Sequence, residues 1–239
     1  MNRTGARLKC GLARPGHVHV WTIRLLRGYL PAAVLSRHLN YREQALARTY
    51  RDASTKRQYQ ASRYAVRKLA SCYAAVAAGT LVLSRGGLGQ PLLKRPRGRN
   101  GTLLHLSISH SERAFALAFS RHARVGVDID TTDHPPAVWR NLSRHFRSSE
   151  HRFTQPLQMI ECWTRKEALL KALGSGLGGL PLLPPLPERA STVRLAQSRW
   201  HVTSLPTFNG CAVACATDGP YGRLSHFTLG SLNALKRIR

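Results

Sequence analysis

The sequence predicts an α+β protein made of two similar half-domains in a pseudo-twofold arrangement, each a small, mainly antiparallel sheet packed with a long helix. Short apolar or alternating segments occur in both halves of the chain. Each half also contains one long segment whose apolar residues recur at helical spacing. We therefore divide the chain into a basic leader at 1–16, which we expect to be disordered, an N-terminal half at 17–122 and a C-terminal half at 123–230.

The N-terminal half begins with His17–Leu25, HVHVWTIRL, whose alternation of apolar and polar residues predicts a strand. From Lys56 to Ala77 the apolar residues recur every three to four positions, which predicts a helix with one apolar face. Gly86–Gly101 is rich in glycine, proline and arginine and is predicted to be a loop. Two strand-like runs follow, at Leu103–Ser111 and Arg113–Ser120.

The C-terminal half begins with the strand-like segment VGVDID, which follows a tight SRHAR turn. A helix is predicted over Leu157–Leu173, ended by Gly174. Gly174–Arg189 is so rich in glycine and proline that we expect a flexible segment. The final strand candidates are Thr192–Ala196, Trp200–Leu205 and Cys211–Ala216.

The composition is strongly basic. The chain has 37 lysines and arginines against 11 aspartates and glutamates, a net charge of +26. Such a charge implies an acidic partner, which could be a nucleic acid, an anionic membrane surface, an acidic protein or a phosphorylated small molecule. The competing interpretation is a solvated basic surface in an arginine-rich protein.

Cysteine usage and hydropathy indicate a cytoplasmic protein. The five cysteines are scattered and form no CxxC pair, which fits a reducing compartment. No apolar run reaches the 18 or so residues of a transmembrane helix. The leader lacks the apolar segment of a secretory signal.

Two of the scarce carboxylates lie in VGVDID. On a strand, Gly126, Asp128 and Asp130 share one face, so the two carboxylates can share one hard cation, and the glycine leaves room for a ligand. The competing interpretation makes Asp130 the start of a turn and Asp128 an isolated edge charge. For this short pattern alone, that interpretation is the stronger one.

A second group of polar residues lies on the predicted C-terminal helix, where Trp163, Glu167 and Lys171 share one face. A glutamate and a lysine at this spacing are also common surface decoration, worth about 0.3 kcal/mol. Together with the two aspartates, however, Glu167 would complete the usual protein share of a Mg²⁺ shell. His110, between two serines, could donate to a phosphate, although such a histidine is more often structural.

Taken together, the segments ISHS, VGVDID and WTRKEALLKALGSGL, in this order, resemble the surfactin-type 4′-phosphopantetheinyl transferases. That family has a Ser-His-Ser box, a (V/I)G(V/I)D-x-E strand and a (W/F)-x-x-K-E-(S/A)-x-x-K helix followed by G-x-G-L. The opening strand, the first long helix and the last strands also match, so the resemblance covers nearly the whole chain.

The resemblance implies transfer of the 4′-phosphopantetheine arm of coenzyme A to a serine of an apo acyl or peptidyl carrier protein. It implies Mg²⁺, with Mn²⁺ as an alternative, held by Asp128, Asp130 and Glu167. Glu167 would also act as the base, and Lys171 would neutralise charge on the phosphates. The residues that would contact the coenzyme are Ser109, His110, Lys171 and Arg51.

Two departures from the family pattern qualify these expectations. Asp130 stands where the family has a glutamate, so the carboxylate is one methylene shorter. Gln90 stands where the family's G-K-P loop has a lysine, and Lys94 or Arg95 is a candidate replacement.

The expected partner is an acidic carrier protein, whose charge is opposite to that of this chain, and the two half-domains suggest a monomer. The alternative function is a basic nucleic-acid-binding module that uses patches such as RYAVRK and KRPRGR. It leaves the spacing of Asp128, Asp130 and Glu167 unexplained, because carboxylates repel a phosphate backbone. An inactive scaffold is a third alternative, against which the intact carboxylates argue.

Overall fold

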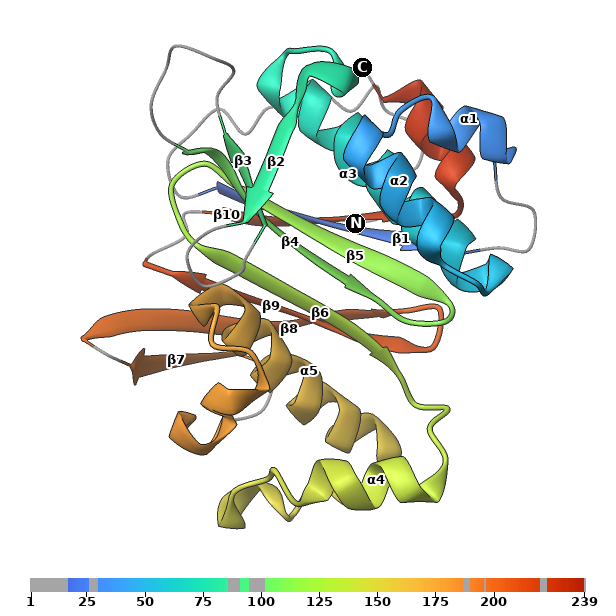
Figure 1. Cartoon of the computed structure of the whole chain (residues 1–239). Helices are drawn as coiled ribbons and strands as arrows, with labels where there is room; N and C mark the ends of the chain where they lie inside the picture. Colours follow the sequence, from blue (N-terminus) through green and yellow to red (C-terminus); the bar gives the residue numbers. More distant parts are fainter. Residues whose placement is uncertain are drawn as a thin grey trace.

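The computed structural model describes residues 17–25, 30–85, 91–94, 102–186, 190–195, 197–219 and 223–238. Two sheets lie face to face and each carries a long helix on its outer face, which gives four layers (Figure 1). The predicted α+β class with two mainly antiparallel sheets, each packed with a long helix, is confirmed. The predicted leader, 1–16, lies outside the described residues.

The first sheet has six strands in the order β10-β1-β5-β4-β3-β2. Their bounds are β1 (His17–Arg24), β2 (Val82–Arg85), β3 (Pro91–Lys94), β4 (Thr102–His110), β5 (Ala114–Ser120) and β10 (Arg223–Leu229). The second sheet has four antiparallel strands in the order β6-β9-β8-β7. Their bounds are β6 (Val125–Thr131), β7 (Ala190–Leu195), β8 (Ser198–Phe208) and β9 (Cys211–Asp218).

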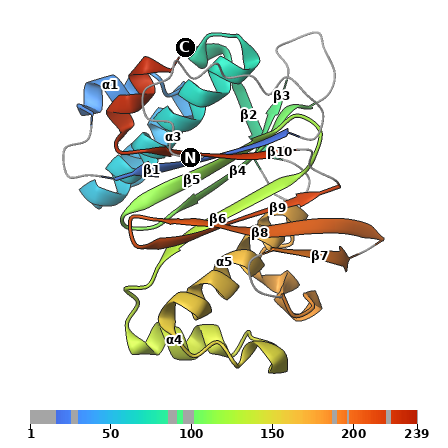
Figure 2. The same cartoon turned by 180° about the vertical axis from the view of Figure 1, so that it is seen from behind.

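Helix α3 (Ala53–Ala74) covers the outer face of the six-stranded sheet, and α5 (Pro156–Leu173) covers that of the four-stranded sheet (Figure 2). Strand β5 shows how the layers divide. Phe115, Leu117 and Phe119 pack in the core shared with α3, whereas the alternate alanines pack in the core between the sheets. Every residue of β5 is buried because the strand has a neighbour on both faces.

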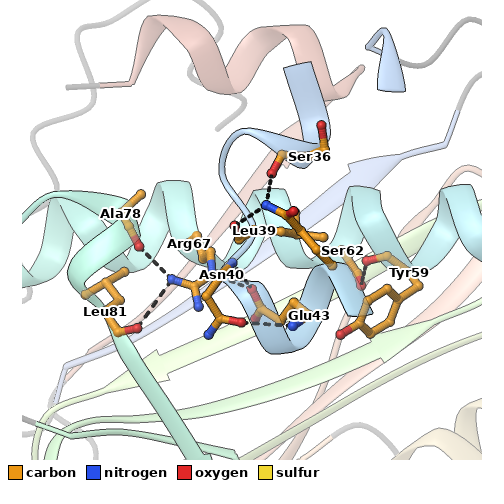
Figure 3. Close-up of polar contacts among 10 residues, drawn as sticks. Ser36, Leu39, Asn40, Glu43, Tyr59, Ser62, Arg67, Ala78 and Leu81 are labelled. Atoms are coloured by element: carbon orange, nitrogen blue, oxygen red, sulfur yellow. Dashed lines mark hydrogen bonds and ion pairs between the residues drawn. The ribbon is translucent and has the colours of Figure 1, made fainter. Parts of the chain in front are cut away.

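The shorter helices are α1 (Ala32–Ser36), α2 (Tyr41–Thr49), α4 (Pro136–Ser143), η1 (Ala78–Thr80), η2 (Ser148–Glu150), η3 (Leu177–Leu182) and η4 (Leu232–Arg237). A buried polar cluster joins α2 to α3 (Figure 3). The fully buried Arg67 donates to Glu43 at 2.6 Å and to the carbonyl of Ala78 at 2.6 Å. Glu43 also closes a capping box with Asn40 at the start of α2. This cluster fixes the helix pair that borders the site described below.

The last strand of the protein lies beside the first strand. Strand β10 pairs in parallel with β1, and Trp21 stacks on Phe227 across that pair. Leu232 and Leu235 of η4 then pack in the core under α3. The six-stranded sheet is thus completed by residues from the C-terminal end of the chain. The division into half-domains at 17–122 and 123–230 stays a prediction.

Two predictions about loops are wrong in part. Within the predicted loop at 86–101, Pro91–Lys94 forms β3, which pairs with β2 and β4 because its short apolar segment fits the core. The predicted flexible segment at 174–189 contains η3, and Leu180, Leu183 and Leu186 pack with α5 and the second sheet. Gln90 and Arg95 lie outside the described residues.

Within the described ranges, none of the helices combines the length and the apolar composition that crossing a membrane requires.

Candidate active site

The close contact between α5 and β6 begins at Gly126. A Cβ at this position would lie 1.9 Å from the carbonyl oxygen of Ala168 and 2.6 Å from the amide nitrogen of Ala172. Only glycine therefore lets the backbone of α5 approach the strand this closely. We expected the glycine to leave room for a ligand. That reason is wrong, because the helix occupies the space.

The approach of α5 brings Lys171 to Asp128, two residues beyond the glycine on the same face of β6. The ammonium of Lys171 donates to Oδ1 of Asp128 at 2.6 Å and to the hydroxyl of Ser109 at 2.8 Å. Asp128 is only 5% exposed. A buried carboxylate requires such donors, because an unpaired charge in the interior is costly.

Strand β4 contributes two serines to the same place. The hydroxyl of Ser109 donates to Oδ1 of Asp128 at 2.6 Å, and that of Ser107 accepts from the amide of Val127 at 3.0 Å. These serines alternate with Leu106 and Ile108, which pack toward α3. The alternation along β4 thus turns its polar residues toward β6. The structure brings Ser109, Asp128 and Lys171 together from three separate elements.

Asp130 lies one strand repeat beyond Asp128 and is also held through Oδ1. That oxygen accepts from the amide of Thr131 at 2.8 Å and contacts Nε2 of His134 at 3.0 Å. Burial raises the pKa of Asp130, and the charge of Asp128 adds to this, while the contacts with His134 and Thr131 lower it. Sequence reasoning missed His134. The signal was a histidine four residues after Asp130, in the segment DHPP.

Glu167 is the third carboxylate. It is half-buried, and within the described part of the chain its side chain makes no hydrogen bond or ion pair. Burial raises the pKa of Glu167, and the charge of Asp128 and then that of Asp130 raise it as well, with Lys171 opposing. The charges of Asp128 and Asp130 on β6 therefore act on Glu167, although it comes from α5.

The chemistry of this group fits a hard divalent cation. Carboxylate oxygens are the ligands that Mg²⁺ and Mn²⁺ prefer, and such a cation would relieve the repulsion and the cost of burial. Among the residues that the structure describes, no three histidine, cysteine or acidic side chains stand in a ready metal-binding cluster. Lys171 and His134 instead engage Asp128 and Asp130. The metal site therefore stays a proposal.

His110 ends β4 beside Ser109 and is exposed. Partial desolvation lowers the pKa of its ring, as does the nearby charge of Lys171. The ring borders a pocket of about 330 Å³ that is lined by residues of α2, α3, their connection and β4. Arg51 is exposed in that connection, and its neighbours Tyr50 and Thr55 line the pocket. Arg51 is thus adjacent in the chain to a residue that lines this pocket, and within the described residues no contact joins it to the carboxylates.

Two other residues of the α5 motif, Lys166 and Trp163, contact parts of the protein other than the carboxylate group. Lys166 is fully buried and forms an ion pair with Glu150 at 2.8 Å. Glu150 also accepts from the amides of Arg147 and Leu186, so the pair links α5 to two loops. Trp163 packs at the meeting point of three apolar clusters. Lys166 thus points away from the group formed by Glu167 and Lys171.

The sequence is similar to those of known proteins. A model of the 4′-phosphopantetheinyl transferase superfamily matches residues 124–217, which include the three carboxylates and Lys171. The chain is 25% identical over 214 residues to the 4′-phosphopantetheinyl transferase HetI of Nostoc sp., covering 84% of this chain and 88% of that protein.

The second group of relatives is matched over a shorter length. The L-aminoadipate-semialdehyde dehydrogenase-phosphopantetheinyl transferase of Homo sapiens is 28% identical over 131 residues, which cover 49% of this chain and 42% of that protein. The Xenopus laevis protein of the same name is 29% identical over 111 residues, 41% of this chain and 37% of that protein. None of these descriptions supports the nucleic-acid-binding alternative.

Proposed function

We propose that the chain is a member of the 4′-phosphopantetheinyl transferase superfamily and that it moves the 4′-phosphopantetheine arm of coenzyme A onto a serine of an apo carrier protein. Adenosine 3′,5′-bisphosphate is the second product. The observation that carries the proposal is the meeting of Ser109, Asp128 and Lys171 from β4, β6 and α5, with Glu167 beside them.

The reaction is a substitution at phosphorus. The serine oxygen of the carrier bonds to the β-phosphorus of the coenzyme's pyrophosphate, and the bond from that phosphorus to the bridging oxygen breaks. The serine proton must leave, and the bridging oxygen departs with the adenosine bisphosphate. Such reactions are accelerated mainly by positioning and by neutralising phosphate charge.

Asp128, Asp130 and Glu167 are the residues that would hold Mg²⁺ or Mn²⁺, and the ion would neutralise the pyrophosphate. Glu167 is also the proposed base for the serine proton. Burial and the charges of Asp128 and Asp130 raise the pKa of Glu167 while no cation is bound. Lys171 is a fixed cation beside the same carboxylates and is proposed to stabilise charge on the phosphate oxygens.

Ser109, His110 and Arg51 are the proposed contacts to the coenzyme. Ser109 and His110 occupy the end of β4, next to Lys171, and the pocket beside His110 carries Arg63 as well as aromatic side chains. A phosphorylated nucleotide fits this lining in chemical terms, since Arg63 can pair with its phosphates and the rings of Tyr50 and Tyr59 can contact a base.

The surfactin-type subdivision, the acidity of the carrier, the monomeric state and the cytoplasmic location are further parts of this proposal. The net charge of +26 supports an acidic partner, because opposite charges raise the rate of encounter.

The test is the mass of an apo carrier protein after incubation with this protein, coenzyme A and Mg²⁺. We expect a gain of one phosphopantetheinyl group, which a chelator abolishes. Asp128→Ala should abolish the gain. Asp128→Ala should also leave non-specific binding to DNA unchanged or stronger, which separates the proposal from the nucleic-acid alternative. Absence of the mass gain with every apo acyl and peptidyl carrier tried would contradict the proposal.

A further inference from the structure

His134 contacts Asp130 but has no role in the reaction proposed above. Its Nε2 lies 3.0 Å from Oδ1 of Asp130, and the two side chains are 23% and 24% exposed. The contact is therefore sheltered from water on most sides. Asp130 is also the residue that departs from the family's usual glutamate.

The backbone around His134 fixes the place of the imidazole. The histidine precedes Pro135 and Pro136, and α4 begins there with Pro135 as its N-cap. Proline restricts both its own backbone and that of the residue before it, so His134 has little freedom. The ring also contacts Trp139 of α4 edge to face, with the centroids 5.5 Å apart. The imidazole is thus in contact with Trp139 as well as with Asp130.

Both known contacts of Asp130 use one oxygen. Thr131 donates its amide to Oδ1, and the imidazole meets the same Oδ1. Within the described residues, Oδ2 takes part in no hydrogen bond or ion pair. This division leaves one oxygen for the protein and the other for a ligand. In metal sites, partners of this kind orient the carboxylates that bind the ion.

We propose that His134 is a positioning residue of the cation site: it holds Oδ1 of Asp130 so that Oδ2 can bind the divalent ion together with Asp128 and Glu167. The inference rests on the proposed function, since it assumes that the carboxylates bind a metal. It explains how an aspartate can serve at a position where a longer carboxylate is usual. The contact with His134 removes the rotational freedom of the shorter side chain.

The direct test is Mn²⁺ binding in the presence of coenzyme A, followed by electron paramagnetic resonance of the free ion. We expect His134→Ala to weaken binding about 10-fold to 100-fold, the usual effect of losing such a partner. His134→Gln keeps a donor and should recover part of the affinity. His151→Ala removes an exposed histidine that follows η2 and should bind like the wild type.

The outcomes separate this inference from the function on which it rests. If the wild type binds no Mn²⁺, the metal part of the proposed function fails. If the wild type binds Mn²⁺ and His134→Ala binds it equally well, the positioning role alone is overturned. A pulsed spectrum that shows imidazole nitrogen bound to the Mn²⁺ would also overturn it, because His134 would then be a ligand. Unchanged thermal unfolding of His134→Ala would show that the variant is folded.

Discussion

Glu167 is a carboxylate whose surroundings oppose its charge. It is half-buried, lies near two other carboxylates and makes no hydrogen bond in the described part of the chain. The same features that make it a candidate ligand and base should make it destabilising when no cation is bound. Functional residues commonly have such a cost in stability.

Glu167→Gln tests this cost. The variant removes a repelling charge at nearly constant volume, so without divalent ions it should unfold at a higher temperature than the wild type. Mg²⁺ should raise the unfolding temperature of the wild type, because an ion that binds only the folded state stabilises it. The variant should show little of this response and should have lost transferase activity. Scanning calorimetry with EDTA or Mg²⁺ measures both effects.

Glu161→Gln is the matched control on the same helix, since Glu161 is half-buried but lies outside the carboxylate group. It should respond to Mg²⁺ as the wild type does. Equal Mg²⁺ stabilisation of wild type and Glu167→Gln would contradict a role for Glu167 in the cation site.

Gly126→Ala tests the contact that places α5. A Cβ at this position would overlap the helix backbone, so α5 must move away from β6. We expect a loss of about 1–3 kcal/mol in the free energy of unfolding, typical of overpacking, together with a large loss of activity. Gly79→Ala is the control, because a Cβ there would meet nothing within 4 Å. Urea denaturation gives the stabilities, and wild-type stability of Gly126→Ala would disprove the close contact.

At the scale of elements, the pairing of β1 with β10 makes the stability of the fold depend on pH. His19 of β1 and His226 of β10 are held neutral. Burial lowers the pKa of both to about 4, and nearby cationic groups add to the effect at His19. Nδ1 of His19 bonds to the hydroxyl of Tyr73 at 2.9 Å, and Nε2 of His226 bonds to that of Thr22 at 3.0 Å.

The sign of the pH effect follows from proton uptake. In the unfolded chain these histidines protonate near pH 6.5, whereas in the folded protein they protonate near pH 4. Stability should therefore fall as the pH is lowered from about 6.5 to about 4, because the unfolded state binds more protons there. His19→Gln with His226→Gln should flatten this part of the profile, as measured by urea unfolding at each pH. Parallel profiles for the two proteins would rule out the effect.

Elements with a strong internal pattern were predictable from sequence. The bounds of β1 and α5 agree with the structure to within about two residues, since alternation, helical spacing and Gly174 mark them locally. Strands β3 and β10 were not predicted. Strand β3 has only 4 residues, and the conformation of both strands depends on pairing with other strands, β4 and β1. Such pairing leaves little local signal.

The candidate site was predictable to the same extent. Asp128, Asp130, Glu167 and Lys171 were named as candidates from their spacing and from the family resemblance, and their roles stay a proposal. The contact of His134 with Asp130 was not predicted, because a histidine four residues after an aspartate does not by itself identify its partner. Likewise, the sequence showed a glycine beside the two aspartates. Why Gly126 must be a glycine follows only from the position of α5 in the assembled fold.

At the scale of the whole molecule, the net charge of +26 should govern the encounter with the carrier. If the carrier is acidic, kcat/KM for the carrier should fall as salt rises, because charges separated by more than about 10 Å are screened at 0.1 M salt. The KM for coenzyme A should change less at saturating carrier. A rate that is flat from low to high ionic strength would exclude electrostatic steering.

The location of the steering charges can be tested at constant net charge. Arg140 and Arg144 are exposed on and just after α4, which follows His134 and lies near the carboxylates in the chain and in the fold. Arg37 and Lys236 are exposed just after α1 and on η4, which lie at the opposite end of the molecule from α4, as both views show (Figures 1 and 2). Arg140→Glu with Arg144→Glu should reduce kcat/KM for the carrier about tenfold or more. Arg37→Glu with Lys236→Glu should change it much less, and equal effects would indicate that only net charge matters.

The most direct measurement is anomalous diffraction from crystals of this protein grown with coenzyme A and Mn²⁺. The account predicts one strong manganese peak within bonding distance of carboxylate oxygens from Asp128, Asp130 and Glu167, with the pyrophosphate beside it. Bound coenzyme with no manganese between these three side chains, or a manganese ion held elsewhere, would contradict it.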